Sequence, residues 1–491
     1  MIRANAGDLS GLIGVIENPD PLRDRNLLMV EKTRIDGIDL ANGATKLRKV
    51  GGPLAPWKLY GNPAAGDPST VSIPDVDRVI NALMERRTIK SFPAGNEGDF
   101  GPAAVTVKVW ADGFEANPDA KAEPKEKGKP ITITFGKKEG ELINVKRVSP
   151  EGTTTYFLMP EKIKIGTGND SADLFQIASK SRLDLLDRDL PKFSSTNVTK
   201  LAVSGAVNFD VDRDDKADGS AGNPVFRFAA DAKGAAGQVY KKGEQADTQA
   251  ILGMLDILAT TPSVTRFVDE LPTPEKLAEY GLGPNPRLKV TIGLTSAEDK
   301  ERGYDFGKET ADPDLVYAQL RGKKAVFALP KFIYDKFNAD LRNKQIFKVN
   351  PAEVAKIEIQ AWGNVLGSPV DVVFVKKDGV WVSEKGPVKD VDQGKVAAFL
   401  NALGSLQVRT FTNDLAPDPK FGLLDPKQFF VVTLVKPDGN HHLHLRVGGP
   451  ADPNGTTLYA LTNRVPNGQP IVTVDAAPFK PFKEGPAAFA K

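Results

Sequence analysis

The three histidines of the chain fall within four positions, at His441, His442 and His444. If this segment is a strand, residues two apart point to the same face, so His442 and His444 have the spacing of a two-residue metal chelate. The sequence offers no third ligand, and a solvated hairpin strand explains the cluster equally well. We therefore predict no bound metal, and a metal-dependent hydrolase, with His442 and His444 as ligands, is the least favoured function.

A second candidate ion site is the acidic stretch 210–219. Asp210, Asp212 and Asp214 have the alternating spacing of the first oxygen ligands in a calcium loop. The sixth position, where such loops use glycine, is Asp215, and the twelfth, where they use glutamate, is Ala221. The stretch also joins two predicted strands rather than two helices. We interpret it as the polar tip of a hairpin, with no calcium required.

Two tryptophans, Trp57 and Trp381, could form a ligand-stacking platform, or anchor the core behind predicted hairpins. The chain has no cysteine, which excludes disulfides, thiolate nucleophiles and Cys-ligated zinc or iron–sulfur centres. The histidine cluster has no nucleophile-elbow sequence beside it. We predict a non-enzymatic protein without a cofactor.

The composition is that of a globular protein with ordinary surface chemistry. Hydrophobic residues make up 40% and charged residues 26% of the 491 positions, and 65 bases nearly balance 63 acids for a formal charge of +2. So small a net charge does not indicate binding to nucleic acid or to an anionic membrane. No apolar run reaches the roughly 18 residues of a membrane span, and the N-terminus lacks the features of a signal peptide.

Residues 341–359 carry a pattern that the chain repeats at 22–40 and 185–203. The copies begin 163 and 156 residues apart (185 − 22 and 341 − 185), a period that indicates a duplicated domain. A base recurs as Arg25, Arg188 and Lys344, and we expect it to complement the dipole at the end of a short helix. The shared apolar columns are Leu22/Leu185/Leu341, Leu27/Leu190/Ile346, Val30/Phe193/Val349, Ile35/Val198/Val354, Ile38/Leu201/Ile357 and Leu40/Val203/Ile359.

Each copy follows one predicted plan of short strands, an amphipathic helix, an aromatic–glycine pair and further hairpins. Asp378-Gly379 is a hairpin signal, and Asp75 and Asp247 are plausible helix caps. The aromatic–glycine pairs begin at Phe100, Tyr280 and Phe421, where the ring would plug the core while the glycine allows a turn. The charged stretch 116–130 is predicted to be a mobile hairpin insertion.

These elements predict an α+β protein: a tandem repeat of about three β-rich domains, with mostly antiparallel sheets and one or two packed helices each. The predicted boundaries are 22–184, 185–340 and 341–491. Residues 1–21 are interpreted as the remnant of a preceding repeat or as an N-terminal cap.

The combination of V-x-x-I-x-I before a hairpin, KKDGVW, FLNALGSL, KFGLLDP and TLYALT resembles the bacterial family called domain of unknown function 4340. The resemblance is best over about 340–480, good over 185–340 and recognisable over 22–185. It implies an envelope protein, usually held by an N-terminal membrane helix and associated with ABC-type transport components of the kind linked to gliding motility. The family has no attributed catalytic residues. This sequence departs from the pattern because it has no such helix.

We therefore expect a non-enzymatic, extracytoplasmic (periplasmic) scaffold or accessory protein of an ABC-type transport or envelope machine. Its partners would be proteins, among them membrane transport subunits, and the chain as given would not insert into a membrane. The alternative is an envelope module that binds a glycan or a peptide.

Overall fold

The computed structural model describes residues 10, 13–14, 16–17, 22–49, 51, 54–62, 64, 68–116, 121–166, 170–215, 224–260, 263–296, 300–345, 347, 349–361, 370–412, 414, 416–462 and 471–491. The predicted leading segment 1–21 lies mostly outside these residues. Its interpretation as a remnant or cap therefore stays a prediction.

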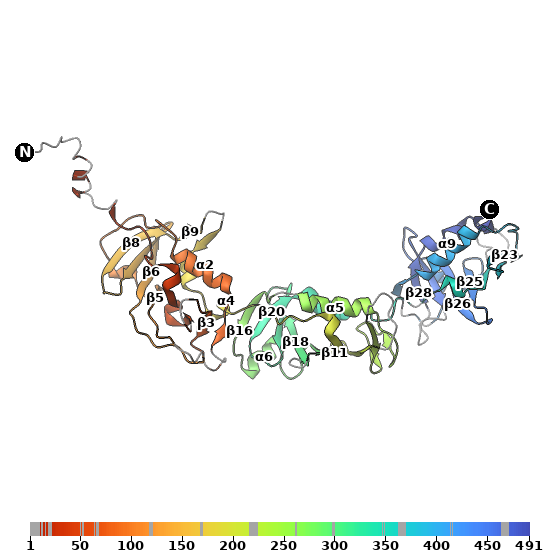
Figure 1. Cartoon of the computed structure of the whole chain (residues 1–491), viewed down its shortest axis with the longest axis horizontal. Coiled ribbons are helices and arrows are strands. Elements are labelled where there is room, and N and C mark those ends of the chain that lie inside the picture. Colours follow the sequence, from red (N-terminus) through yellow and green to blue (C-terminus); the bar gives the residue numbers. More distant parts are fainter. Residues whose placement is uncertain are drawn as a thin grey trace, which may run out of the picture. The chain divides into compact units, whose positions relative to one another are not determined.

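The first sheet is antiparallel and has eight strands in the order β4-β3-β2-β1-β5-β6-β7-β8 (Figure 1). Helix α2, Ile73–Leu83, buries Val76, Val79, Ile80 and Leu83 against it, as the three- and four-residue spacing of these side chains requires. The strands are β1 Ile35–Leu40, β2 Thr45–Lys49, β3 Trp57–Tyr60, β4 Ser69–Thr70, β5 Val105–Ala111, β6 Ile131–Glu139, β7 Leu142–Val148 and β8 Thr154–Pro160. After them come β9 Lys162–Lys164, β10 Ser171–Asp173, α3 Leu174–Ala178 and α4 Arg182–Leu185.

The second sheet has the order β13-β12-β11-β17-β18-β19-β20-β16. Its strands are β11 Val198–Gly205, β12 Phe209–Asp214, β13 Val225–Phe228, β16 Arg266–Asp269, β17 Leu288–Leu294, β18 Glu301–Glu309, β19 Leu315–Leu320 and β20 Val326–Pro330. A small hairpin, β14 Ala232–Lys233 and β15 Val239–Tyr240, precedes helix α5, Thr248–Thr260. Helices α6, Pro274–Tyr280, and α7, Lys331–Asp335, are shorter.

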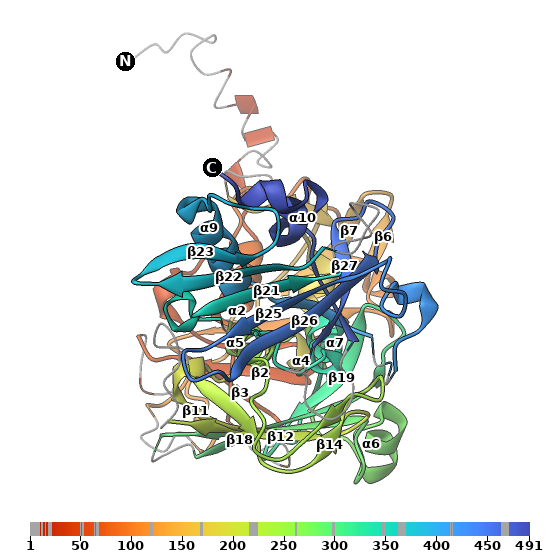
Figure 2. The same cartoon turned by 90° about the vertical axis from the view of Figure 1, so that its right-hand side faces the viewer.

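The third sheet has the order β23-β22-β21-β25-β26-β27-β28-β24, seen face-on in Figure 2. Helix α9, Gln393–Gly404, packs on it, and Asp392 caps the helix by accepting hydrogen bonds from the N–H groups of Gly394 and Lys395. The strands are β21 Lys356–Gln360, β22 Val372–Lys377, β23 Val380–Lys385, β24 Val408–Phe411, β25 Phe430–Val435, β26 His441–Pro450, β27 Thr457–Thr462 and β28 Ile471–Asp475; helix α10, Lys480–Lys483, follows.

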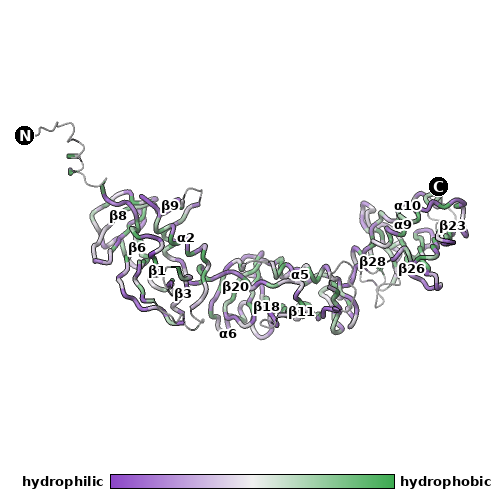
Figure 3. The backbone as a smooth tube through the Cα atoms, viewed as in Figure 1, coloured by the Kyte–Doolittle hydropathy of each residue, from purple (hydrophilic) through white to green (hydrophobic). Residues whose placement is uncertain are grey.

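The second and third sheets share one strand order: three strands from the first hairpins, four later strands, and the strand after the long helix at the far edge. The first sheet has no named strand at that edge, but Ser91 forms a bridge with Leu158 of β8 there. The predicted α+β class with mostly antiparallel sheets is confirmed. Figure 3 shows hydrophobic and hydrophilic stretches interleaved along the sheets, as expected for faces that are buried on one side.

The chain forms two compact units. The first comprises Met1–Lys192, Thr260–Arg287 and Tyr304–Phe332, and the second comprises Phe193–Ala259, Leu288–Gly303 and Ile333–Lys491. Strands of the second sheet are thus divided between the units, with β16, β19 and β20 in the first and β11, β12, β13 and β17 in the second. The predicted repeat boundaries do not coincide with this division and remain a prediction.

The repeated columns are mostly core positions. Ile38, Leu201 and Ile357 are all buried, whereas Leu22 is 72% exposed although Leu185 and Leu341 are fully buried. Leu185 and Leu341 each follow a preceding sheet. Leu22 follows no sheet among the residues that the structure describes. Ile346 lies outside those residues.

The aromatic–glycine pairs lie over a bulge in each sheet. A Cβ on Gly136, Gly307 or Gly448 would come within 2.4 Å of a backbone oxygen of the pair segment, at Asp99, Tyr280 and Phe421 respectively. The strand pairing shifts register beside each of these three glycines. In the third sheet the ring of Phe421 belongs to a small cluster with Leu423 and Ile471, separate from the main core, so the prediction that it plugs the core was wrong.

The insertion predicted to be a mobile hairpin is anchored over the part that the structure describes. Glu115 donates its N–H to the carbonyl of Lys125. Glu123 pairs at 2.9 Å with Arg48, which is 1% exposed and also pairs with Asp39 at 2.7 Å. The buried guanidinium requires carboxylate partners, and the insertion supplies one of them. Residues 117–120 lie outside the described residues.

Candidate functional site

A short extended segment, residues 185–189, joins two sheet edges within the first unit, and we call it the first strap. On one side Ser72 donates its N–H to the Leu185 carbonyl at 2.9 Å, and Leu186 bridges to Val71. On the other side Val264 donates its N–H to the Arg188 carbonyl at 2.8 Å. The strap therefore adds backbone hydrogen bonds to both the β4 edge and the β16 edge.

The recurring base was predicted to complement the dipole at the end of a short helix, and for Arg188 this prediction was wrong. Helix α4 ends at Leu185, three residues before Arg188, and the guanidinium of Arg188 lies 3.5 Å from Asp75 in the first turn of α2. Asp75 in turn accepts a hydrogen bond from the Ser72 hydroxyl at 2.6 Å, and Ser72 rather than Asp75 occupies the cap position. The base thus pairs with an acid at a helix N-terminus.

The second unit contains a strap of the same geometry, residues 341–345, which we call the second strap. Asp247 donates its N–H to the Leu341 carbonyl at 2.8 Å, and Val408 donates its N–H to the Lys344 carbonyl at 2.9 Å. The Lys344 ammonium lies 3.8 Å from Asp247, which caps α5 as predicted by accepting hydrogen bonds from Gln249 and Ala250. Ile89 makes the corresponding bond to the Arg25 carbonyl at 3.1 Å in the first unit.

A buried tyrosine supports the second strap. The Tyr240 hydroxyl accepts a hydrogen bond from the Leu341 N–H at 3.2 Å, and its ring stacks on Phe228 at 4.6 Å between centroids. Burial raises the pKa of Tyr240 to about 12, because the charged phenolate would lose its hydration. Arg342 of the strap lies over the ring of Phe411, 4.2 Å from its centroid.

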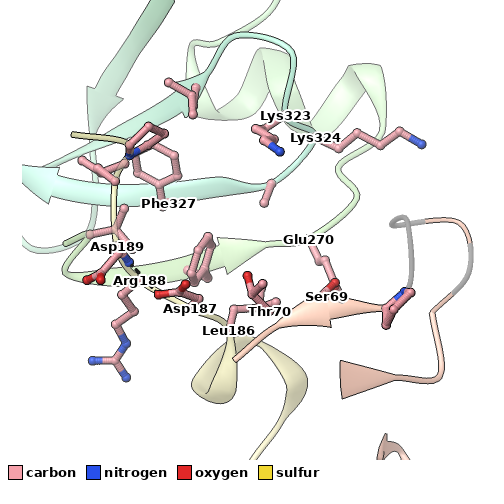
Figure 4. A pocket seen from close by; sticks show the side chains of 17 residues that line it. Ser69, Thr70, Leu186, Asp187, Arg188, Asp189, Glu270, Lys323, Lys324 and Phe327 are labelled. Carbon is pink, nitrogen blue, oxygen red and sulfur yellow. Dashed lines mark hydrogen bonds between the residues drawn. The ribbon is translucent and has the colours of Figure 1, made fainter. Parts of the chain in front are cut away.

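A cavity of about 460 Å³ opens beside the first strap and lies wholly within the first unit (Figure 4). Its floor is apolar, and its rim carries the hydroxyls of Ser69 and Thr70 and charged groups of both signs. Figure 4 shows Thr70, Asp187 and Glu270 on one side, with Lys323 and Phe327 opposite, while Arg188 points away. The apolar side chains are Leu186, Leu190, Val264, Phe267, Leu320 and Phe327.

The cavity wall is fixed by a buried ion pair. Glu270 accepts two hydrogen bonds from Arg182, at 2.9 and 2.7 Å, and a third from Asn62 at 3.2 Å. Arg182 is 9% exposed and also donates to the carbonyl of Tyr60. Lys324 closes another side by donating to the Ala64 carbonyl at 2.9 Å. The walls are thus held before any ligand enters, which lowers the entropic cost of binding.

Two charged rim groups remain available to a ligand. Among the described residues, the Asp187 carboxylate accepts only the N–H of Asp189, at 3.0 Å, and the Lys323 ammonium forms no hydrogen bond or ion pair. The described lining residues supply carboxylates, hydroxyls and ammonium groups around an apolar floor. This chemistry suits the binding of an amphipathic ligand. Sequence reasoning pointed to Arg188 through the recurring base, but not to the cavity, because Glu270 and the strap meet only in the fold.

The segment that carries the three histidines contains a bulge in β26. Leu434 pairs with Leu443, but the next residue, Val435, pairs with His441, so His442 is the extra residue. The Nε2 of His442 accepts the N–H of Asn350 at 3.2 Å, and the Nδ1 of His444 lies 3.0 Å from the Thr433 hydroxyl. Burial lowers the pKa of His444. The bulge breaks the alternation that would place His442 and His444 on one face, and because His442 is 6% exposed, the solvated strand that was expected is wrong at this position.

The three acids considered as calcium ligands, Asp210, Asp212 and Asp214, lie on strand β12 rather than at the hairpin tip that was predicted. Asp210 pairs with Lys200 at 2.8 Å, and Asp214 pairs with Arg227 at 2.7 Å. Asp212 faces the same two bases in the strand register. Cross-strand pairing explains the alternation of these acids. Residues 216–219 of the segment lie outside the described residues. Among the residues that the structure describes, no group of three or more histidine, aspartate or glutamate side chains could hold a metal ion.

Trp57 and Trp381, the two tryptophans considered for ligand stacking, are core residues. Trp57 is 8% exposed in β3, and Trp381 is 6% exposed in β23, where its backbone N–H donates to the side-chain oxygen of Gln393 at 2.8 Å. Each ring belongs to the main apolar cluster of its sheet. The core-anchor interpretation accounts for their positions, and little ring surface is left for a ligand.

Comparison with known proteins supports the predicted family resemblance. Residues 238–420 match the model of the family described as "Domain of unknown function (DUF4340)". The match covers helix α5, the second strap and helix α9. No curated protein matches the chain.

Among solved structures, a transferrin-binding protein B double mutant from Haemophilus parasuis Hp5, a vaccine antigen, is 8% identical. The similarity covers 90% of this chain and spans 64% of that protein's length, with a TM-score of 0.08. At that score the similarity carries no argument. Among the residues that the structure describes, no helix is long and apolar enough to cross a membrane.

Proposed function

We propose that this chain is a non-enzymatic scaffold or accessory protein of an extracytoplasmic ABC-type transport or envelope machine, built from three copies of one folding unit. The observation that carries the proposal is the pair of straps. Each compact unit contains a segment whose carbonyls accept the N–H of a residue at a helix start and the N–H of a residue at the beginning of an edge strand or just before it. Adjacent sheets fixed in this way are suited to holding partners at a set spacing.

The proposal of three copies rests on the strand order that the second and third sheets share and on the equivalent glycines beside bulges in all three sheets. The transport context rests on the family resemblance over residues 238–420. The direct test is chemical cross-linking in native membranes of the source bacterium, followed by mass spectrometry of a tagged chain. Enrichment of transport permease or ATPase subunits over an unrelated tagged envelope protein is expected. If neither kind of subunit is enriched, the proposal is overturned.

Location is tested separately by adding protease to intact spheroplasts. We expect the tagged chain to be digested while a cytoplasmic marker survives. Digestion only after lysis would place the chain inside the cell and refute the extracytoplasmic part of the proposal.

A second candidate function, an envelope module that binds a peptide or glycan, is favoured by the cavity beside the first strap. Its preformed walls, apolar floor and free rim groups at Asp187 and Lys323 suit an amphipathic ligand. We suggest a thermal-shift screen of short peptides and envelope glycans against the wild type and Ala325→Trp, which fills the cavity. Stabilisation confined to the wild type supports this function. Stabilisation shared by both proteins, or seen in neither, counts against it.

A further inference from the structure

A second, smaller cavity opens in the first unit where one sheet departs from the pattern of the other two. Tyr317 and Tyr459 occupy the third position of β19 and β27 and oppose Ala328 and Thr473. The same register position in β7 is Asn144, which opposes Leu158. The first sheet therefore carries a small amide where the second and third carry a phenol ring.

The missing ring changes the packing of the aromatic–glycine pair. Tyr317 contacts Tyr280 at 4.7 Å between ring centroids, and Tyr459 contacts Phe421 at 4.8 Å. In the first sheet Phe100 instead reaches Tyr156 of the next strand, at 6.0 Å. A cavity of about 200 Å³ results, and its lining includes Asn144.

The cavity is rich in hydrogen-bond acceptors. Asn144 is 7% exposed, and its amide N–H₂ donates to the Lys137 carbonyl at 3.2 Å and to Glu139 at 2.8 Å. No hydrogen bond to its Oδ1 occurs among the described residues, and this oxygen is not a buried atom. The carboxylates of Glu139 and Asp99 also line the cavity, and no base is among the lining residues described. Three residues with acceptor side chains thus line the cavity, and none of the lining residues described carries a positive charge.

The rest of the lining is apolar and suits a carbon chain. Phe100, Val145 and Leu158 lie beside the acceptors, together with the ring of Tyr156. The neighbouring Lys146 ammonium pairs with Glu97 at 2.8 Å and lies 5.9 Å from the centroid of the Phe100 ring, but Lys146 is not among the lining residues. An ammonium has three donors and no acceptor, and a lysine carries it on an apolar stem that packs against hydrocarbon and aromatic surface.

We propose that this cavity binds the ammonium group of a lysine side chain presented by a protein partner. The inference rests on the scaffold proposal for the identity of the partner. Binding of the side chain alone does not depend on it. The ammonium would donate to Asn144 Oδ1, Glu139 and Asp99, and the methylene stem would lie along Phe100 and Leu158.

The test is saturation-transfer difference NMR of the full chain with Nα-acetyl-lysine methylamide as the probe. We expect transfer to the δ and ε methylene protons in the wild type. Asn144→Tyr, which introduces the ring that the other sheets carry, should reduce the transfer at least five-fold. Glu139→Gln, an isosteric change at an exposed position, should reduce it several-fold without affecting folding. Glu141→Gln, an exposed acid in the same hairpin but outside the cavity, is the matched control and should bind as the wild type does.

A second probe, Nα-acetyl-norleucine methylamide, has the same carbon chain without the ammonium and should show little transfer. Equal transfer to the two probes overturns the proposal, as does undiminished transfer in both Asn144→Tyr and Glu139→Gln, or no transfer in the wild type. Because the probe replaces the partner, a positive result here with a failed cross-linking experiment would reject the transport scaffold and retain the lysine site.

Discussion

Arg182 and Glu270 form a buried, two-pronged ion pair across 88 residues of sequence, with Nε–Oε2 at 2.9 Å and Nη2–Oε1 at 2.7 Å. Arg182 begins helix α4, and Glu270 directly follows strand β16. With the first strap, the pair fixes the edge of the first sheet to that of the second within the first unit.

Removing one partner of this pair should destabilise the first unit strongly. In Glu270→Ala the guanidinium stays buried without its carboxylate, at a cost of about 3–5 kcal/mol in the free energy of unfolding. The double variant Arg182→Met/Glu270→Leu should recover most of the loss, since no charge stays buried. Urea denaturation measures the free energy of unfolding of the single and the double variant. Lys276→Ala, which breaks an exposed pair with Glu279, should leave the midpoint unchanged. A single variant as stable as the wild type would contradict the role assigned to the pair.

The straps should be visible in hydrogen exchange. The amides of Val264 and Val408 donate to strap carbonyls and belong to buried residues, so we expect them to exchange as slowly as interior strand amides. The amides of residues 378–379, at a hairpin tip, serve as a fast-exchanging reference. Mass spectrometry with peptide-level resolution is sufficient. Exchange of residues 264 and 408 at the rate of the hairpin tip would show that the straps are open in solution.

The glycines beside the bulges should tolerate no side chain. A Cβ at Gly307 would lie 2.0 Å from the Tyr280 carbonyl oxygen, so Gly307→Ala must move backbone and should cost about 1–3 kcal/mol. Gly253→Ala is a control of opposite sign, because that glycine is exposed within α5 with open space around it. This change should stabilise the chain by about 1 kcal/mol. Thermal melting of both variants gives the comparison, and a neutral Gly307→Ala would refute the close approach.

Stability should fall at high pH through Tyr240. Its pKa is raised to about 12 from an ordinary 10.0, so between these values the unfolded chain loses the phenol proton while the folded chain keeps it. The unfolded state then binds fewer protons than the folded state. The contribution of Tyr240 to the free energy of unfolding is therefore fully present below pH 10 and is lost as the pH rises towards 12. It amounts to roughly 2–3 kcal/mol. Urea unfolding of the wild type and Tyr240→Phe at pH 9 and 11.5 should show a smaller decrease for the variant; equal decreases would exclude this tyrosine as the cause.

Local patterns predicted much of the fold. Ile251, Met254, Leu255 and Leu258 are spaced for one helix face, and all four are buried. Asp378-Gly379 predicted a tight hairpin, and both residues have positive φ between the paired Lys377 and Val380. These features depend on neighbours in sequence, so the sequence alone was sufficient to find them.

Features set by contacts between distant segments were not predictable in the same way. The bulge at His442 breaks an alternation that the sequence presents as regular, and it follows from pairing with β25. The cavity beside the first strap needs Asp187 and Glu270 to meet, and no motif links them. The smaller cavity did have a signal, the Asn144 that stands where Tyr317 and Tyr459 recur, but only the strand register aligns these positions.

The straps also have a consequence for how the protein behaves at high concentration. Strands β4, β16 and β24 each form one of the two edges of their sheets, and each would offer unpaired peptide groups to another molecule. Residues 185–189 pair alongside the first two, and Val408 of β24 is held by Lys344. Sheet margins covered from within the same chain cannot recruit strands from neighbours, so the backbone bonds that join the sheets also guard against fibrous self-association.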